Sequence, residues 1–453
     1  MQPVPTEGLP SFAELGLPRP MVEALRRAGL TDPFPIQAAT IPDVLAGRDL
    51  LGRASTGSGK TMAFGLPLLA RLSGASAPAR RPRGLVLVPT RELAMQVTDA
   101  LTPIGHAMNM RVRLVAGGLP MGKQITALER GVDVLVATPG RLVDLINRRA
   151  CSLDGVEITV LDEADHMADL GFLPVVRDLL DQTAGGGQRL LFSATLDGDV
   201  GTLVENYLTD PAAHALSSAI ASVDTMEHHL FRTSHEAKFD VAAELAGRDG
   251  RTLMFVRTKH GADRLAKQLG RVGVQAAALH GGRSQSQRTR ALNEFKEGTV
   301  PVLVATDVAA RGIHVSDISL VVHVDPPADP KDYLHRSGRT ARAGEDGMVV
   351  LLSTPADERA TRRMLRDAGV EPTQRDVMPG SADVATLTGA RRPSGTPIAV
   401  APSRPRASTY AGQSSRPRNG RGASNGGYRG NSQRSSSHRS GAPSTGSRER
   451  HSA

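Results

Sequence analysis

Residues 54–61, Ala-Ser-Thr-Gly-Ser-Gly-Lys-Thr, have the composition of a loop that binds nucleotide phosphates. They follow a short apolar segment, Asp49-Leu50-Leu51, and precede a segment of helical character. A glycine-rich turn between a strand and a helix directs backbone N–H groups inward, and the helix N-terminus adds positive field. Lys60 would then reach the β- and γ-phosphates of ATP, and the Thr61 hydroxyl would hold Mg²⁺. Ala54 stands where the usual pattern has its first glycine, and the alternative is a glycine-rich turn with a solvated lysine. The remaining predicted phosphate contacts are Ser55, Thr56, Gly57, Ser58 and Gly59.

An acidic cluster follows an apolar run about 100 residues further along the chain. Ile158-Thr159-Val160-Leu161 leads directly into Asp162-Glu163-Ala164-Asp165. This pattern is typical of a buried parallel strand that presents acids at its C-terminal edge. Asp162 would hold Mg²⁺, and Glu163 would orient and deprotonate the attacking water. The alternative is an acidic helix start, which the nearby phosphate-binding loop disfavours.

Composition limits the class of protein. The 453 residues are enough for two domains and a tail. The single cysteine, Cys151, excludes a disulfide framework, fits a reducing compartment, and is more typical of a structural residue than of a reactive thiol. The first residues carry no signal pattern, and no apolar run has the length of a membrane span. We therefore expect a soluble, cytoplasmic protein without a membrane partner. We also expect it to be a monomer.

The positive charge is concentrated at the C-terminal end. The formal net charge is +9, but residues 391–453 alone carry 12 arginines, no lysine and one acid, Glu449. The rest of the chain is therefore slightly acidic. This asymmetry indicates an anionic polymer as the partner of the tail.

Short β-rich runs alternate with amphipathic helical stretches in two successive blocks, which predicts an α/β fold with two parallel sheets covered on both faces. Two such domains in tandem form a cleft between their strand-end loops. Residues 212–223 lack strong periodicity and are a candidate hinge, and the pattern fades after the helix predicted at 356–368. The predicted strands are Gly84–Pro89, Arg111–Ala116, Val132–Ala137, Ile158–Leu161 and Arg189–Phe192 in the first block, and Arg251–Val256, Val274–Leu279, Val300–Ala305, Ile318–Val324 and Gly347–Leu352 in the second.

With these motifs in place, the chain resembles the DEAD-box ATP-dependent RNA helicases of superfamily 2 from Ser11 to Ala368. About ten separate motifs occur in the order found in that family. The resemblance implies two tandem RecA-like domains. The predicted boundaries are a disordered N-terminus at 1–10, a first domain at 11–212, a hinge at 213–226, a second domain at 227–370 and a disordered tail at 371–453.

Residues 29–37, Gly-Leu-Thr-Asp-Pro-Phe-Pro-Ile-Gln, resemble the adenine-recognition motif of the family. Phe12 lies 17 residues before its glycine, as in that family. The Gln37 amide offers both a donor and an acceptor, so it can pair with the N7 and N6 edge of adenine. An exposed glutamine at a helix start is the alternative. Leu30 occupies a position that is commonly aromatic, which implies weaker stacking on the adenine.

Three first-domain segments resemble RNA-contacting motifs of the family, and each follows a predicted strand. They are Pro89–Ala94, Gly117-Gly118 and Thr138–Arg141. Glycine or proline there brings N–H groups and helix starts close to phosphates. Ser193-Ala194-Thr195 resembles the motif that couples the state of ATP to RNA. The implied roles are RNA binding for Thr90, Arg91, Gly118, Thr138 and Arg141, and coupling for Ser193 and Thr195.

The second domain contains the remaining motifs. Gln285–Arg288 and Ala305–Gly312 resemble RNA and nucleotide contacts, which assigns RNA binding to Arg288 and Thr306 and nucleotide binding to Asp307. His335–Arg342 resembles the arginine-finger motif. Because Arg339 and Arg342 are three residues apart, one helical face can direct both to a phosphate, and guanidinium groups suit the charge of a transferred phosphoryl group. A solvated basic helix face is the alternative, and His335 is assigned to coupling. The family usually has aspartate where this chain has His314, and this departure puts a contact to the ATP ribose in doubt. The family also usually has glycine where this chain has Ala341.

Together these motifs predict an RNA-stimulated ATPase that uses ATP and Mg²⁺. Single-stranded RNA would cross both domains on its phosphates and 2′-hydroxyls, and simultaneous binding would close the cleft around the γ-phosphate. RNA bent in the closed state cannot stay paired, which implies local separation of short duplexes or remodelling of RNA–protein complexes. An ATP-gated RNA clamp or annealing chaperone is the alternative, and a DNA-directed helicase is another. Ribosomal precursors and RNA-decay machinery are possible partners.

The C-terminal tail is a separate hypothesis. Arg418–Gly422 and Gly426–Gly430 resemble arginine–glycine RNA-binding segments, in which guanidinium groups pair with phosphates. Tyr410 and Tyr428 can stack on bases. The alternative is a solubilising disordered linker.

Overall fold

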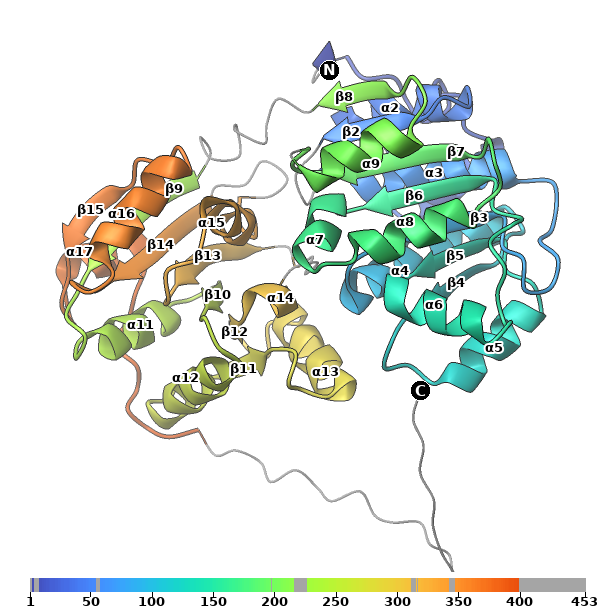
Figure 1. The fold of residues 1–453 in the computed structure, drawn as a ribbon. Coiled ribbons are helices and arrows are strands. Elements are labelled where there is room, and N and C mark those ends of the chain that lie inside the picture. The colour runs from blue at the N-terminus through green and yellow to red at the C-terminus, as the bar shows by residue number, and fades with distance from the viewer. Residues whose placement is uncertain are drawn as a thin grey trace, which may run out of the picture. The chain divides into compact units, whose positions relative to one another are not determined.

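The computed structural model describes residues 2–3, 8–53, 58–196, 198–215, 226–310, 315, 317–341 and 347–398. Within this part of the chain, two parallel β-sheets are each covered by helices on both faces (Figure 1). The predicted α/β architecture of two tandem parallel-sheet domains is therefore confirmed. No helix among the described residues is long and apolar enough to cross a membrane.

The first sheet has eight strands in the order β1-β8-β2-β7-β6-β3-β5-β4, and every pair is parallel. All five strands predicted in the first block are present within two residues of their expected ends. Because the chain order jumps along the sheet, strands β2, β6 and β7 lie side by side and place their C-terminal ends together. The strands are β1 (Gln2–Pro3), β2 (Leu50–Arg53), β3 (Gly84–Leu87), β4 (Val112–Val115), β5 (Val134–Ala137), β6 (Ile158–Asp162), β7 (Gln188–Ser193) and β8 (Ala212–Ala215).

Successive side chains of the first-domain strands point to opposite faces of the sheet, so the core of this domain has two layers. In β3, Val86 faces one apolar cluster, whereas Leu85 and Leu87 face the other. Helices α1 to α4 cover the first face, and α5 to α9 contribute to the second (Figure 1). These helices are α1 (Arg19–Arg27), α2 (Pro35–Leu45), α3 (Lys60–Leu72), α4 (Arg91–Ala107), α5 (Met121–Glu129), α6 (Pro139–Asn147), α7 (Ala164–Asp169), α8 (Leu173–Asp181) and α9 (Asp199–Tyr207).

Helix α4 shows how the sequence specifies these elements locally. The Thr90 hydroxyl caps its start by accepting the Leu93 N–H at 3.3 Å. Leu93, Val97 and Leu101 recur every four residues and are all buried in the first cluster. The cysteine in the second cluster, Cys151, is also buried, and burial raises the pKa of its thiol to about 12. Its predicted structural role fits this protonated state.

The second sheet has seven strands in the order β11-β12-β10-β13-β14-β9-β15, again all parallel. The five strands predicted in the second block are present within two residues of their expected ends. The strands are β9 (Met226–Arg232), β10 (Arg251–Phe255), β11 (Ala276–Leu279), β12 (Val302–Ala305), β13 (Ile318–His323), β14 (Gly347–Ser353) and β15 (Thr373–Asp376).

Helices cover both faces of the second sheet as well. Val350 and Leu352 of β14 pack into a cluster with α11, α12 and α17, whereas Val349 and Leu351 pack with α15 and α16 on the opposite face. Helix α13 contributes to a further cluster at the β11–β12 end. These helices are α11 (Lys238–Ala246), α12 (Lys259–Arg271), α13 (Gln285–Lys296), α14 (Asp307–Ala310), α15 (Pro330–Ser337), α16 (Glu358–Asp367) and α17 (Ala382–Thr388).

The predicted disorder at 1–10 and both predicted ends of the hinge are wrong. Gln2–Pro3 pairs in parallel with the edge of β8, so the predicted disordered segment at 1–10 contains a strand. Residues 213–215, assigned to the hinge, belong to β8, which pairs with β2. Met226, also assigned to the hinge, is the first residue of β9. Backbone pairing with an existing strand stabilises these segments although they lack apolar alternation. Residues 216–225 lie outside the described residues.

The predicted start of the tail at residue 371 is also wrong. Strand β15 pairs with β9, and Val377, Val384 and Ala390 are buried in the second-domain core. Gly395 and Ile398 donate backbone hydrogen bonds to the end of α12 and the residue after it. The second domain therefore extends well beyond residue 370. Residues 399–453, with the predicted arginine–glycine segments and both tail tyrosines, lie outside the described residues.

Candidate active site

The predicted phosphate-binding loop connects β2 to α3. Gly59 is the last loop residue and has φ = 90° and ψ = 13°, a left-handed conformation that glycine adopts readily. A Cβ atom at this position would lie 2.6 Å from Nε2 of Gln37. Both the backbone conformation and the close approach therefore require glycine. Lys60 and Thr61 follow in the first turn of α3, and Ser58 precedes Gly59. Ser55, Thr56 and Gly57 lie outside the described residues.

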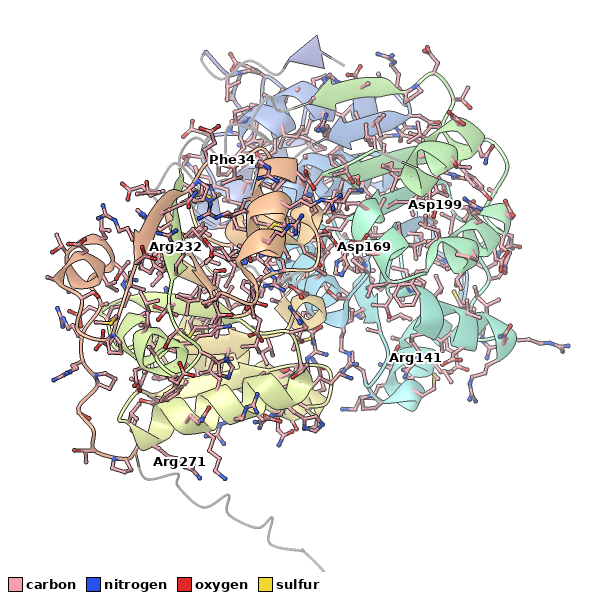
Figure 2. All side chains as sticks on the ribbon, turned by 60° about the vertical axis from the view of Figure 1, so that its left-hand side comes forward. Phe34, Arg141, Asp169, Asp199, Arg232 and Arg271 are labelled. Carbon is pink, nitrogen blue, oxygen red and sulfur yellow. The ribbon has the colours of Figure 1, made fainter. Side chains whose placement is uncertain are left out.

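Gln37 connects the start of α2 to this loop. Its Oε1 accepts the Phe34 N–H at 2.9 Å, and its Nε2 donates to the Gly59 carbonyl oxygen at 3.0 Å. The side chain is buried, so these two bonds hold its amide in one orientation. Each amide atom retains capacity for one more hydrogen bond, which is what an adenine contact needs. Phe34, labelled in Figure 2, is 43% exposed and lies against Gly59; the sequence reasoning did not single it out.

The acidic cluster lies at the C-terminal end of β6, as predicted. Asp162 is the last residue of the strand, and its Oδ1 lies 3.9 Å from Nζ of Lys60. Both side chains are buried. Glu163 has φ = 53° and ψ = 52°, a left-handed conformation that costs a non-glycine residue roughly 1–2 kcal/mol. This strained turn ends the extended backbone of β6 and begins α7. The side chains of Asp162 and Glu163 therefore contact different residues.

The two acids have different protonation behaviour. Burial raises the pKa of Asp162 to about 6, and Lys60 opposes that effect. Burial also acts to raise the pKa of Glu163, but a hydrogen bond with His166 and the positive charges of Lys60 and Arg339 lower it well below its usual range. The His166 Nδ1 lies 3.3 Å from Glu163 Oε2. Glu163 is therefore held as a carboxylate, the form that can accept a hydrogen bond from water.

Mg²⁺ fits the residues that were predicted to hold it. The Thr61 hydroxyl and the Asp162 carboxylate are oxygen donors, which Mg²⁺ prefers. Among the described residues, no group of three or more acids, histidines or cysteines could form a metal site from protein alone. One carboxylate together with nucleotide phosphates and water is the usual set for this ion.

Asp165 connects the acidic cluster to the predicted coupling motif. Its Oδ2 accepts the N–H groups of Ala194 and Thr195 at 3.1 and 3.2 Å. Its own N–H donates to the Ser193 hydroxyl, which in turn donates to the Thr195 carbonyl oxygen at 2.6 Å. Nε2 of His335 lies 3.9 Å from the same Oδ2. The three predicted coupling residues therefore meet at Asp165, to which sequence reasoning had assigned no role.

The arginine-finger segment is placed by α15. Arg339 and His335 line one pocket with Lys60 and Glu163, and Arg339 is buried, its Nε donating to the His335 carbonyl oxygen at 3.2 Å. This pocket brings a predicted finger to the predicted phosphate-binding lysine. Arg342 lies outside the described residues, as do 311–314, including the departure at His314.

Asp307, predicted to bind nucleotide, is held by a residue that the sequence reasoning did not single out. Arg336 donates to its two carboxylate oxygens at 2.5 and 2.8 Å and to the Asp325 carbonyl oxygen at 2.9 Å. The guanidinium also lies over the Phe255 ring, 5.1 Å from its centre. Arg336 is buried and Asp307 is partly exposed. This bidentate pair connects α14 to α15 and so helps to position the segment that carries Arg339.

The predicted RNA-binding residues of the first domain lie at the C-terminal ends of β3, β4 and β5. Thr90 caps α4, and Thr138 is the residue before α6. Residues 116–120 connect β4 to α5, and we call them the glycine loop. A Cβ atom on Gly118 would overlap the Arg91 guanidinium, so that arginine lies against the glycine loop. Arg141, labelled in Figure 2, donates to the Leu119 carbonyl oxygen at 3.0 Å. Arg91 and Arg141 therefore both contact the loop between β4 and α5.

Two further predicted RNA contacts belong to the second domain. Arg288 on α13 lies 3.0 Å from the buried carboxylate of Glu92. Gln285 donates to Glu92 at 3.0 Å and accepts from Arg91 at 2.6 Å. Thr306 follows β12 directly and is buried. The structure therefore brings Arg91 and Arg288 together through Glu92 and Gln285, neither of which was predicted as a site residue.

The site combines a glycine-rich loop at a helix start, an acid pair at the C-terminal end of β6, two strands away in the same sheet, and an arginine from a second parallel-sheet domain. This combination defines a two-domain nucleoside triphosphatase. Comparison with known proteins identifies its family. The model of the DEAD/DEAH box helicase domain matches residues 34–203, and that of the helicase conserved C-terminal domain matches residues 237–344. The chain belongs to the DEAD-box ATP-dependent RNA helicases, a family of enzymes.

Individual relatives agree with this assignment. The chain is 38% identical over 383 residues to the DEAD-box ATP-dependent RNA helicase CshA of Bacillus subtilis, covering 83% of this chain and 77% of the relative. It is 37% identical over 384 residues to CshA of Geobacillus kaustophilus, covering 83% and 81%. Among solved structures, S. cerevisiae Dbp5 bound to RNA and ADP BeF3 has a TM-score of 0.75 at 30% identity, with 84% of this chain and 98% of that chain covered. The two sheets with their covering helices are thus RecA-like domains.

Proposed function

We propose that this protein hydrolyses ATP in an RNA-stimulated reaction and uses it to separate short RNA duplexes locally or to remodel RNA–protein complexes. The observation that supports this most directly is the position of Asp165. Its carboxylate holds the Ser193–Thr195 segment and lies beside His335, while the adjacent acids Asp162 and Glu163 lie beside Lys60. The contacts of Asp165 to the Ser193–Thr195 segment and to His335 therefore adjoin the acids of the nucleotide site in sequence and in space.

The nucleotide would bind between α2 and the start of α3. Gln37, already fixed by Phe34 and Gly59, would present its amide to adenine, and Lys60 would move its ammonium from Asp162 toward the phosphates. Mg²⁺, held by Thr61 and Asp162 with the phosphates, would neutralise negative charge there. Lys60 opposes the burial that raises the pKa of Asp162, and Mg²⁺ would have the same effect on that carboxylate once the lysine has moved toward the phosphates.

Glu163 would orient the attacking water through its carboxylate, and Arg339 would stabilise charge on the transferred phosphoryl group. Arg342 is proposed as the second finger on the basis of the motif resemblance and its spacing from Arg339. RNA would bind along Thr90, Arg91, Gly118, Thr138 and Arg141 of the first domain and Arg288 and Thr306 of the second. Since Arg91 and Arg288 pair with Gln285 and Glu92, phosphates would compete for the same guanidinium groups.

ATP turnover of the full chain with and without single-stranded RNA tests this proposal. Glu163→Gln should lower RNA-stimulated turnover by about 10²–10⁴-fold while leaving ATP binding intact, because a carboxylate that assists proton transfer contributes that much. Glu157→Gln, an exposed acid of the same domain, is the matched control. ATP hydrolysis that is equally fast without RNA would overturn the proposal.

Assays with different nucleic acids distinguish a helicase from the alternative functions. We expect a short RNA duplex to be separated in an ATP-dependent way. Turnover with RNA but no strand separation would instead indicate an ATP-gated clamp or annealing chaperone. Equal stimulation by single-stranded DNA would contradict the choice of RNA.

A further inference from the structure

A basic groove lies at the edge of the first domain, away from the candidate active site. It is formed by the edge strand β4 with the residue before it, and by α5 with the two residues after it. The hollow has a volume of about 540 Å³. We call it the β4/α5 groove; its lining includes Arg111, Arg113, Gly122, Lys123, Thr126 and Arg130.

Four of these lining residues are cationic. Arg111 is partly neutralised, since its Nε lies 3.4 Å from a buried carboxylate oxygen of Asp133 and its guanidinium donates to the Arg130 carbonyl oxygen. Among the described residues, Arg113, Lys123 and Arg130 form no ion pair, and all three are exposed. Three cations therefore face solvent around one hollow, an arrangement in which their mutual repulsion has no compensating anion.

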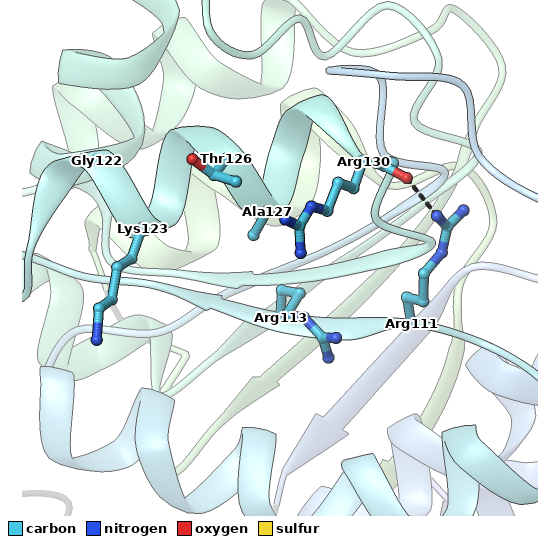
Figure 3. Close-up of a pocket in the computed structure, with 8 residues that line it drawn as sticks. Arg111, Arg113, Gly122, Lys123, Thr126, Ala127 and Arg130 are labelled. Carbon is cyan, nitrogen blue, oxygen red and sulfur yellow. Dashed lines mark hydrogen bonds between the residues drawn. The ribbon is translucent and has the colours of Figure 1, made fainter.

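The cations are distributed along the groove. Lys123 lies in the first turn of α5, and Arg130 directly follows its last turn, with Arg113 on the strand below (Figure 3). The nine-residue helix is about 13 Å long at 1.5 Å per residue. One strand of a stacked duplex rises by about 3.4 Å per nucleotide, and the phosphates of an extended strand lie farther apart, so the groove has room for at most about four consecutive phosphates. An extended polyanion fits this spacing better than a single small anion does.

The groove is continuous with the glycine loop that is proposed to contact RNA. The loop connects β4 to α5, so Gly118 and Lys123 are five residues apart. Gln124 of α5 donates to the carbonyl oxygens of Ala116 and Leu119 at 3.2 and 3.3 Å, which fixes the helix start against the loop. A strand bound at Gly118 would therefore lie next to the end of the groove that Gly122 and Lys123 line.

We propose that the β4/α5 groove binds the phosphate backbone of RNA that extends beyond the segment held between the two domains. The inference rests on the proposed function, because it takes the glycine loop as an RNA contact. Arg113, Lys123 and Arg130 contact phosphates and carry no sequence information, which suits an enzyme that acts on varied RNAs. The groove would add affinity for long RNA and leave catalysis to the candidate active site.

The test compares the full chain with the triple variant Arg113→Gln, Lys123→Gln, Arg130→Gln. Affinity for a 6-nucleotide and a 20-nucleotide single-stranded RNA is measured against salt concentration. Each phosphate contact contributes about −0.7 to the log–log salt slope for single strands, so three lost contacts should make the slope shallower by about 2 for the long RNA. Between 50 and 200 mM salt, the unmodified chain should then lose roughly 20-fold more affinity than the variant. The short RNA should show no difference, and neither should ATP turnover at saturating short RNA.

A matched control removes three cations from α16 of the second domain, Arg359→Gln, Arg363→Gln and Arg366→Gln, which are also exposed. An identical salt slope in the groove variant and this control would overturn the proposal. A second contrary outcome is that the unmodified chain binds poly-glutamate, that the groove variant does not, and that both bind RNA equally. This outcome would also overturn the proposal and assign the groove to an acidic polypeptide. If RNA fails to stimulate ATP turnover of the unmodified chain, the proposed function fails first. If stimulation is present and the slope is unchanged, the groove proposal alone fails.

Discussion

Replacement of Asp165 by asparagine should uncouple RNA binding from ATP hydrolysis. The carboxylate accepts two backbone N–H groups through one oxygen, at 3.1 and 3.2 Å, and lies 3.9 Å from His335. Hydrogen bonds to a charged group contribute about 1.5–3 kcal/mol, against about 0.5–1.5 kcal/mol for neutral pairs. The neutral amide keeps the shape but should weaken each of the two bonds by about 1 kcal/mol, or about 2 kcal/mol in total.

A loss of about 2 kcal/mol corresponds to roughly a 30-fold change in an equilibrium constant. We therefore expect the ratio of turnover with RNA to turnover without RNA to fall by about that factor in Asp165→Asn. ATP affinity should stay within a few-fold, because Lys60, Thr61 and Gln37 are unchanged. Steady-state ATPase assays at saturating RNA, together with ATP titrations, measure both quantities.

Asp178→Asn on α8 is a suitable control, since that aspartate is exposed and is not part of this network. The reasoning would be refuted if Asp165→Asn retained the full RNA stimulation while losing ATP affinity. That result would make Asp165 part of the nucleotide site and leave no role for its contacts to Ala194 and Thr195 in coupling.

Two further predictions test the loop and the second-domain core. Gly59→Ala should abolish stabilisation of the chain by ATP, measured by thermal unfolding, because a Cβ atom would collide with Gln37 at 2.6 Å. Gly74→Ala is the control, because Gly74 has the same φ of 90° but a Cβ atom there would have no other atom within 4 Å. This variant should show only the backbone cost of roughly 1–2 kcal/mol in the free energy of unfolding. Equal loss of ATP binding in both variants would contradict the collision argument. His323 is fully buried, and burial, with Arg336 and His228 nearby, lowers its pKa well below the usual value. The unfolded state then binds a proton that the folded state excludes, so stability should fall as pH drops below about 6.5, by about 1.4 kcal/mol per pH unit. His323→Phe should remove this part of the slope in urea unfolding between pH 5 and 7, and an unchanged slope would contradict it.

The sequence by itself determined the central strands and the order of the motifs. Val86, Val160 and Val304 lie in continuous apolar runs because strands of a covered parallel sheet are buried on both faces. Such runs are visible without any tertiary information. The residue types at the nucleotide site were equally visible, because phosphate binding requires glycine, lysine and hydroxyl groups at fixed spacing.

Edge strands and boundaries were decided by the tertiary structure. Strand β15, Thr373–Asp376, has no apolar alternation and forms because β9 offers it an unpaired backbone. Strand β9 itself begins with Met226, Glu227 and two histidines and becomes a strand between β14 and β15. Hydrogen bonding between backbones is independent of side-chain type, so sequence patterns do not reveal it.

The partners of the site residues were also decided by the tertiary structure. No spacing rule connects Asp165 to Thr195, Arg336 to Asp307, or Gln37 to Gly59, since each pair is separated by 20 or more residues. These contacts exist because parallel strands from distant parts of the chain end at the same edge of a sheet. The sequence therefore identified which groups can do chemistry, whereas the fold determined which of them act together.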